Sequence, residues 1–396
     1  MAKEMFLAGC SAAAYGAKLS RVEVISSYPI RPYTGIMMEL SKLVANGELD
    51  AEFVHGEGEH AQVSIAYGAS AAGARAYTGS SGVGVVYAME CYSPAAGGRL
   101  PCQMAIADRA LDPPGDFGSE HTDVMSARDQ GWIMGWSADP QEVLDNTIMF
   151  YKIGEDARIL LPQFCCQDGY FVSHIPGKVD VPDQKQVDEF LPAFDNPHPL
   201  DPTRPVSHGP QIFPDQGPAI DLQRAQAFLD TPKVIEEVVA DYNKQFGRNY
   251  DPFLEEYMTD DAEFVFFLQG GHARTAKFAV NHLREKGVKA GMVRLRFIRP
   301  FPTEAVAETL SKFKAVGTIE TSTSYGGAMK GGNLIHEVRS ALYDVPNAPP
   351  VTSFMAGLGG EVVSLEEFYS MAKVLAEAAK TGKVEQYVYW VNFDKI

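Results

Sequence analysis

Hydrophobic and polar positions follow two patterns in the first 175 residues. Short runs rich in β-branched residues, at residues 22–26 and 83–87, predict buried strands. Residues 66–76 are rich in Ala and Gly, which predicts a helix that packs closely on a sheet or on another subunit. Strands that alternate with helices predict an α/β unit with a mostly parallel sheet.

The same alternation returns in the last third of the chain. Residues 263–268, 291–296 and 315–320 are apolar runs that predict strands, with helices between them. A Gly-rich loop over residues 325–332 leads into a further helix. We therefore expect a second α/β unit.

The pair Gly270 and Gly271 begins the first helix of this second unit. Such a pair either cradles a phosphate at the helix N-terminus or forms an ordinary turn between strand and helix. Because no Gly-Lys-Ser/Thr or Gly-x-Gly-x-x-Gly motif follows, the ordinary turn is favoured.

A proline-rich segment separates the two units. Residues 176–232 contain eleven of the 25 prolines, among Asp, His and Gln. Proline lacks a backbone donor, so the segment predicts an extended arm, either a passive connector or one that wraps a partner. We expect one domain over residues 1–240, with the arm at about 176–232, and a second over residues 258–396 with the C-terminal tail.

Charge and cysteine usage exclude several classes of protein. The net charge of −17 argues against binding to nucleic acid or to an anionic membrane surface. The five cysteines form no Cys-x-x-Cys motif, which favours a reducing cytoplasm and predicts neither a zinc ribbon nor an iron–sulfur cluster in this chain. Residues 5–15 do not fit a signal peptide, and no apolar run approaches the length of a membrane span.

Two segments near the N-terminus carry candidate site residues. Tyr28, Pro29, Arg31 and a second proline form a stiff loop after the first predicted strand, where open α/β sheets build their sites. Arg31 either faces a ligand or pairs with a surface carboxylate. Glu59 follows at a helix start, where a carboxylate is either a helix cap or a buried site residue.

A third segment lies at residues 107–123. Arg109 stands at the base of a loop whose Pro-Pro-Gly and Phe-Gly elements are typical of a lid over a site. Asp112 and Asp116 lie in this loop, either as turn residues or as groups that reach the site.

Read together, these segments resemble the pyruvate:ferredoxin oxidoreductase superfamily. The resemblance rests on matches in order and spacing along nearly the whole chain. The matching segments are residues 9–16 (Gly-Cys-Ser-Ala-Ala-Ala-Tyr-Gly), 28–32 (Tyr-Pro-Ile-Arg-Pro), Glu59, 78–82 (Thr-Gly-Ser-Ser-Gly), 107–111 (Ala-Asp-Arg-Ala-Leu), 121–124 (His-Thr-Asp-Val), 299–302 (Arg-Pro-Phe-Pro) and 357–360 (Gly-Leu-Gly-Gly).

The resemblance implies an α/β protein made of a pyrimidine-type thiamine-diphosphate-binding domain and a transketolase C-terminal-like α/β domain. It implies that Glu59 hydrogen-bonds the cofactor's aminopyrimidine ring beside Tyr28 and Pro29, and that Arg109 binds substrate. A carboxyl group in that role needs a dry pocket and a raised pKa.

The resemblance also implies partner chains. No Gly-Asp-Gly with a later Asn occurs, so we expect Mg²⁺ and the cofactor's diphosphate on a partner subunit and no metal ligand in this chain. We likewise expect [4Fe-4S] clusters on an iron–sulfur subunit, ferredoxin as electron acceptor, and activity only in the assembled complex.

One residue departs from the family pattern, because Arg31 stands where threonine is typical. A second guanidinium beside Arg109 favours a small dianionic substrate, since a monoanion would leave one buried cation unpaired. We therefore hypothesise that the chain is similar to alpha subunits of the oxalate-oxidising branch, which convert oxalate to two CO2 and pass two electrons to ferredoxin. In this hypothesis Asp112 or Asp116 expels the second CO2.

Two alternatives remain open from the sequence. The chain could belong to a pyruvate or other 2-oxoacid:ferredoxin oxidoreductase, or it could be a structural subunit without an active cofactor. The presence of both Glu59 and Arg109 argues against the structural subunit.

Overall fold

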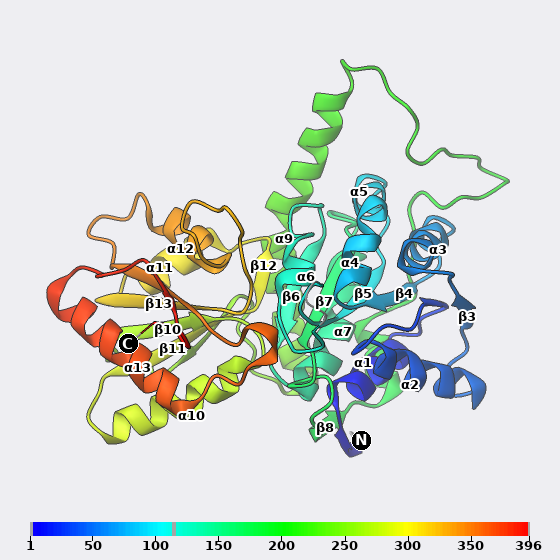
Figure 1. The fold of residues 1–396 in the computed structure, drawn as a ribbon. Coiled ribbons are helices and arrows are strands. Elements are labelled where there is room, and N and C mark those ends of the chain that lie inside the picture. Colours follow the sequence, from blue (N-terminus) through cyan, green and yellow to red (C-terminus); the bar gives the residue numbers. More distant parts are fainter. Residues whose placement is uncertain (1–2, 113–115, 395–396) are drawn as a thin grey trace.

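A computed structural model describes residues 3–112 and 116–394 of the chain. Within them the chain folds into two α/β units that lie side by side, each built around its own sheet (Figure 1). The strands are β1 (Lys3–Leu7), β2 (Val24–Ser27), β3 (Glu52–His55), β4 (Ala76–Ser80), β5 (Gln103–Asp108), β6 (Ile133–Ser137), β7 (Gln163–Asp168), β8 (Gly177–Val181), β9 (Leu254–Tyr257), β10 (Phe264–Leu268), β11 (Ala290–Leu295), β12 (Phe297–Arg299), β13 (Ala315–Glu320), β14 (Val351–Met355) and β15 (Val388–Trp390).

Helices fill the connections between these strands. They are α1 (Gly9–Leu19), α2 (Thr34–Ala45), α3 (Glu59–Ala71), α4 (Val83–Tyr87), α5 (Met89–Gly97), α6 (Thr122–Met125), α7 (Pro140–Gly154), α8 (Gln184–Phe190), α9 (Gly217–Phe246), α10 (His272–Glu285), α11 (Thr303–Leu310), α12 (Leu334–Leu342) and α13 (Leu365–Thr381), with a short 3₁₀ turn η1 (Leu358–Gly360). The fold is thus the expected mixture of largely parallel strands and crossover helices.

The first unit holds a seven-stranded sheet in the described part of the chain, with the order β12-β6-β7-β5-β4-β2-β3. Its strands pair in parallel except at the edge, where β12 runs antiparallel to β6. Because β12 comes from the second half of the sequence, this pairing joins the two units through backbone hydrogen bonds.

The second unit holds a six-stranded sheet of described residues with the order β15-β14-β13-β10-β11-β9. Its strands are parallel except for β9, which pairs antiparallel with β11. The hydrophobic run of residues 263–268 therefore became the central strand β10, which is buried along its whole length. Such fully apolar strands are expected where helices cover both faces of a sheet.

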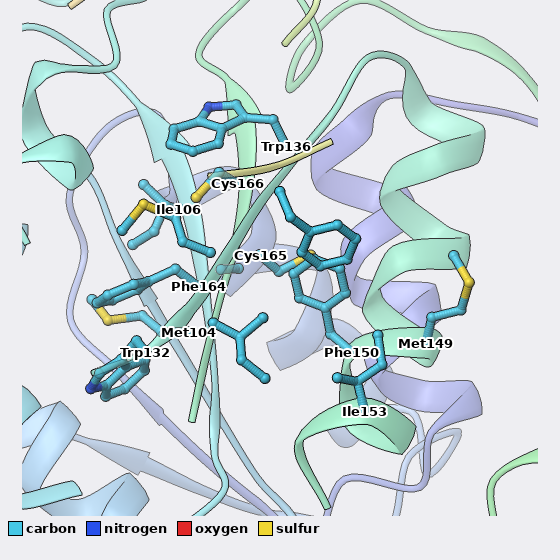
Figure 2. Packing of buried hydrophobic residues seen from close by; sticks show 14 of the residues in the cluster. Met104, Ile106, Trp132, Trp136, Met149, Phe150, Ile153, Phe164, Cys165 and Cys166 are labelled. Atoms are coloured by element: carbon cyan, nitrogen blue, oxygen red, sulfur yellow. The ribbon is translucent and has the colours of Figure 1, made fainter. Parts of the chain in front are cut away.

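Large side chains hold the centre of the first sheet in place (Figure 2). Trp132 stacks on Phe164 with ring centroids 4.4 Å apart, and Tyr92 packs edge-on against both rings. Phe150 of α7 and Trp136 of β6 are also fully buried. This packing fixes β5, β6 and β7 against each other, and the polar residues discussed below follow at their carboxyl ends.

The structure corrects two expectations about local structure. Residues 83–87 form the helix α4 and not a strand, because Gly82 turns the chain at φ +54° directly after β4. The proline-rich segment is extended only over residues 191–216. Its first part forms β8 and α8, and its last part forms the start of α9, which contains Pro232 (Figure 1).

No helix in the described residues combines the length and the apolar composition needed to cross a membrane.

Candidate functional site

The candidate site lies at the carboxyl ends of parallel strands in the first sheet. Strands β2, β4, β5 and β7 are neighbours or near neighbours in one parallel array, so their ends meet at the same edge. Open α/β sheets place ligands at that edge. The predicted site residues follow these strands or the loops next to them.

Glu59 is the first residue of α3, and its side chain is buried with 6% of its surface exposed. Among the described residues its carboxylate accepts a hydrogen bond only from its own backbone N–H. Burial raises the pKa of Glu59, and the nearby positive charge of Arg109 partly opposes this. Among the described residues, no other residue donates a hydrogen bond to this buried carboxyl group. Helix capping alone does not explain a carboxyl group in such surroundings.

Two glycines make room for the site in the turn that leads from β4 into α4. A Cβ atom on Gly84 would overlap the Glu59 carboxylate and the Ser80 hydroxyl, and a Cβ atom on Gly82 would overlap the Arg109 side chain. The segment Thr78-Gly79-Ser80-Ser81-Gly82 thus brings Glu59 and Arg109 to opposite ends of one short turn.

Arg109 follows β5 and is buried, with 6% of its surface exposed. Its guanidinium lies 5.1 Å from the ring centroid of Phe117, and one terminal nitrogen is 3.5 Å from Asp112. Its Nε atom is buried without an acceptor among the described residues. An incompletely satisfied buried guanidinium is well suited to bind an anionic group.

The loop after β2 is exposed to solvent over most of residues 28–31, whereas Pro32 and Tyr33 are buried. Tyr28, Pro29 and Arg31 are exposed, and none of the described residues forms an ion pair or hydrogen bond with the Arg31 side chain. Arg31 and Pro32 are joined by a cis peptide bond. The next residue anchors the loop, because the Tyr33 N–H donates to Ser81 Oγ over 3.2 Å and its hydroxyl bonds Ser27 over 2.7 Å.

The predicted lid divides into parts with different surroundings. Pro113, Pro114 and Gly115 lie outside the described residues. Asp112 is exposed and faces Arg109. Asp116 instead accepts a hydrogen bond from Gly118 N at 2.7 Å and lies against Gly359 of the second unit. The structure therefore brings Asp112, but not Asp116, next to Arg109.

The structure adds buried residues that the sequence reasoning did not assign to the site. Asp123 accepts hydrogen bonds from the backbone N–H groups of Gly82 at 2.7 Å and Arg109 at 3.1 Å. Asp108, at the end of β5, accepts one from Trp136 at 2.7 Å. The sequence did carry one signal that could have found Asp108, because this charged residue directly follows the apolar run Met-Ala-Ile-Ala.

A second buried network links the two units. His121 Nε2 lies 2.8 Å from Asp168 Oδ1, and His121 Nδ1 lies 2.8 Å from the Thr321 hydroxyl of the second sheet. The other Asp168 oxygen accepts from Gly271 N at 2.8 Å. The Gly270–Gly271 turn is thus occupied by this chain's own carboxylate, which supports the ordinary strand–helix turn.

Ligand-type atoms of Asp108, His121 and Asp168 lie within 4.8 Å of one another. His121 and Asp168 already use theirs in the mutual hydrogen bond. We therefore interpret this cluster as a hydrogen-bond network and assign no metal to it.

Comparison with known families gives two matches along the chain. Residues 15–240 match the family "Pyruvate flavodoxin/ferredoxin oxidoreductase, thiamine diP-bdg". Residues 262–368 match "Pyruvate:ferredoxin oxidoreductase core domain II". The first match covers Glu59, Arg109 and Asp123, so the described geometry belongs to a thiamine-diphosphate-binding domain.

Solved structures share the fold. The chain superposes on a 2-oxoglutarate:ferredoxin oxidoreductase from Magnetococcus marinus with a TM-score of 0.71 and 18% identity, covering 93% of this chain and 65% of that one. It also superposes on a split-gene transketolase with a TM-score of 0.53 and 14% identity, covering 94% and 97%. The expected combination of a thiamine-diphosphate-binding domain and a transketolase-like domain is confirmed.

Curated relatives match at higher identity. The chain is 39% identical to pyruvate synthase subunit PorA of Pyrococcus abyssi, over 97% of this chain and 96% of the relative. It is 37% identical to the alpha subunit of NADH-dependent phenylglyoxylate dehydrogenase of Aromatoleum evansii (92% and 88%), and 33% identical to ketoisovalerate oxidoreductase subunit VorA of Pyrococcus horikoshii (98% and 98%). The chain therefore belongs to the pyruvate:ferredoxin oxidoreductase family, as a PorA-like alpha subunit of the 2-oxoacid:ferredoxin oxidoreductase type.

Proposed function

We propose that this chain supplies the aminopyrimidine side of a thiamine-diphosphate site that oxidises a short 2-oxoacid. The observation that carries the proposal is the buried Glu59 carboxyl, which faces the turn beside Arg109 and receives no hydrogen bond from any other residue in the described part of the chain. A ring nitrogen that donates or shares a proton would complete its hydrogen bonding, so the residues present fit this half of the cofactor.

Each residue has a separate part in this proposal. Glu59 shares a proton with the ring nitrogen, and burial raises the pKa of its carboxyl group. Arg109 binds the substrate carboxylate through the guanidinium nitrogens that the protein leaves incompletely paired. Tyr28 and Pro29 border the cofactor from the loop after β2. Bound thiamine diphosphate supplies the electron sink for cleavage of the bond next to the carbonyl.

Partner chains complete the machinery in our proposal. They provide Mg²⁺ and the diphosphate pocket, and the [4Fe-4S] clusters that pass electrons to ferredoxin. The matching relatives are themselves named as subunits, which supports an assembled complex.

Pyruvate or a related 2-oxoacid is the substrate class that we favour. The relatives are named for pyruvate, phenylglyoxylate and ketoisovalerate, and the PorA match extends over 97% of the chain. These compounds are all monoanions, for which one arginine suffices. We therefore favour such a monoanion over oxalate as the substrate, because none of these relatives is named for oxalate.

Oxalate remains a second candidate because of one observation. Arg31 has no partner among the described residues, and its loop is fixed through Tyr33 to Ser81, next to the Gly82 that Arg109 contacts. A second free guanidinium beside the site would pair with a second carboxylate.

The substrate is tested by dye reduction with the purified complex. Viologen reduction is measured with pyruvate, 2-oxoglutarate and oxalate, in wild type and in Arg31→Thr. If a monoanionic 2-oxoacid is the substrate, Arg31→Thr keeps most of its turnover. If oxalate is the substrate, the variant loses it by about 10-fold or more, the loss expected for one charge-assisted hydrogen bond.

The lid carboxylates are tested in the same assay. Asp112 contacts Arg109, whereas Asp116 faces the second unit. Unchanged turnover in Asp116→Ala would remove that residue from the reaction, and the same result in Asp112→Ala would remove the other.

A further inference from the structure

The buried Asp123 carboxylate accepts hydrogen bonds from two backbone segments of the site. One oxygen accepts the N–H of Gly82, from the turn beside Glu59, and the N–H of Arg109, at the start of the lid. The other accepts the N–H of Val124 at 2.7 Å. Asp123 has no measurable exposure, so water does not replace any of these donors.

The same carboxylate is connected to the Arg31 loop through the turn. Gly82 follows Ser81, whose hydroxyl accepts the N–H of Tyr33. One buried acidic group therefore sets the relative positions of three backbone segments: the loop after β2, the turn after β4 and the end of β5. The first segment carries Arg31 and the third leads into Arg109, while the turn between them packs against Glu59.

Asp108 is the second buried acid of this cluster. Its Oδ2 atom accepts from Trp136 Nε1, while its Oδ1 atom is buried without a donor among the described residues. Asp123 is one of its hydrogen-bonding neighbours. Two carboxyl groups in contact, with one oxygen lacking a donor, are satisfied when a single proton lies between them.

We propose that Asp123 is a positioning residue for the substrate-binding Arg109, and that Asp108 carries a proton which it donates to the Asp123 carboxylate. Burial beside Asp123 and Asp168 raises the pKa of Asp108 well above its ordinary value, which agrees with a neutral carboxyl group at this place. The inference rests on the proposed role of Arg109, and it adds the device that holds the arginine in place.

A proton on Asp108 also explains how three acidic side chains can be buried close together. Asp108, Asp123 and Asp168 are all fully buried. Asp168 is balanced by His121 and by Gly271 N, and this network lowers its pKa. Burial raises the pKa of Asp123 to about 7, and its three backbone donors oppose that rise by stabilising the carboxylate. A neutral Asp108 then leaves no carboxylate without compensation.

The test compares substitutions in the assembled complex, with the oxoacid that the wild type oxidises. Asp123→Ala removes the acceptor of the Gly82, Arg109 and Val124 N–H groups, so the Gly82 and Arg109 segments shift. We expect the KM for the oxoacid to rise by about 10- to 100-fold with a smaller change in kcat, because the binding arginine is displaced. An unchanged KM would overturn the positioning role.

The proton is tested at Asp108. Asp108→Asn keeps a neutral donor toward Asp123 and an acceptor toward Trp136, so its KM should stay within about threefold of wild type. Asp108→Ala removes the donor and should raise the KM as Asp123→Ala does. Equal effects of the two Asp108 variants would overturn the proton assignment. This pair also decides the matter if the Asp123 variant does not assemble.

Two controls separate the explanations. Asp145→Ala makes the same change in a fully buried carboxylate of α7 that binds Tyr242, Arg248 and Tyr250, and it should lower stability without changing the KM. Arg109→Ala tests the proposed function itself. A normal KM there would refute the role of Arg109, whereas a raised KM in Arg109→Ala with a normal KM in Asp123→Ala would refute this inference alone.

Metal analysis of the purified complex completes the test. A divalent ion that is present in wild type and lost only in Asp108→Asn would show that the cluster binds a metal instead of a proton, and would overturn the assignment. Equal metal contents in the two proteins support the proton.

Discussion

At the scale of single residues, the site is defined by acids whose surroundings differ. Glu59, Asp108 and Asp123 are all buried, yet within residues 3–112 and 116–394 Asp123 has three backbone donors and Glu59 has its own N–H alone. A carboxyl group that receives few hydrogen bonds keeps its proton more readily. Their chemical roles follow from these donors and not from the residue type.

Replacement of Glu59 tests the proposed catalytic role. Glu59→Gln keeps the size of the side chain but no longer exchanges a proton, so turnover should fall by about 100- to 10,000-fold while the complex still assembles. Viologen reduction measures the loss. Glu57→Gln is the matched control, because Glu57 is exposed two residues earlier and should keep full activity. Comparable losses in both variants would contradict the assignment.

The buried acid Asp108 should leave a signature in the pH dependence of stability. Its pKa is raised above the ordinary 3.8, so the folded chain retains a proton that the unfolded chain releases. Stability therefore falls as the pH rises above about 3.8 toward the folded-state pKa. Asp108→Asn lacks this group, so its melting temperature relative to wild type should increase between pH 4 and pH 7. A constant difference would show that Asp108 is ionised in the folded chain.

At the scale of elements, the site depends on short turns after parallel strands. The turn from β4 into α4 packs against Glu59 on one side and Arg109 on the other, and both contacts need glycine. The helix α4 is only five residues long and begins immediately after Gly82. Its β-branched residues are tolerated because tertiary contacts, including the Tyr92 hydroxyl bonded to Val85 O, hold the turn.

A methyl group added to this turn should disturb the chemistry more than the fold. Gly84→Ala places a Cβ atom against the Glu59 carboxylate, so turnover should fall by about 10-fold or more, as expected for a displaced catalytic group. Gly68→Ala is the control, since its Cβ meets nothing within 4 Å on an exposed face of α3. The control should stabilise the chain by about 0.5–1 kcal/mol and leave activity unchanged. Chemical denaturation and dye reduction measure the two effects.

At the scale of the whole molecule, contacts between the two units fix the position of the loop that forms one side of the site. Strand β12 extends the first sheet, and the backbone of residues 118–121 is bonded to Gly360 and Thr321 of the second unit. Glu120 also accepts from Gly359 N at 3.0 Å. The end of the lid is thus held by the second unit, while its beginning is held by Asp123.

The isolated chain should be inactive in our proposal, because its sequence lacks the Gly-Asp-Gly and Asn elements that hold Mg²⁺ and diphosphate. We expect no viologen reduction by the purified chain with thiamine diphosphate and Mg²⁺, and full activity after partner subunits are added. Activity of the chain alone would show that it holds the whole cofactor site.

The sequence by itself determined the α/β class, both sheets and the family. Apolar runs such as residues 263–268 report burial directly, and motifs such as Tyr-Pro-Ile-Arg-Pro are local in sequence. It also placed Glu59 and Arg109 in the candidate site, through the resemblance of the segments that contain them to the family pattern. Those two residues are also the ones that the fold brings to a single turn.

Only the tertiary structure decided which polar groups are partnered. Residues 83–87 form a helix because Gly82 turns the chain. The proline-rich segment is ordered at its two ends because β8 pairs with β1 and α9 packs on α7. Asp108 and Asp123 are fifteen residues apart, and their contact, like that of His121 with Thr321, depends on how loops fold over the sheet edge. Sequence periodicity reports which face of an element is buried, but a hydrogen bond between distant loops leaves no periodic trace.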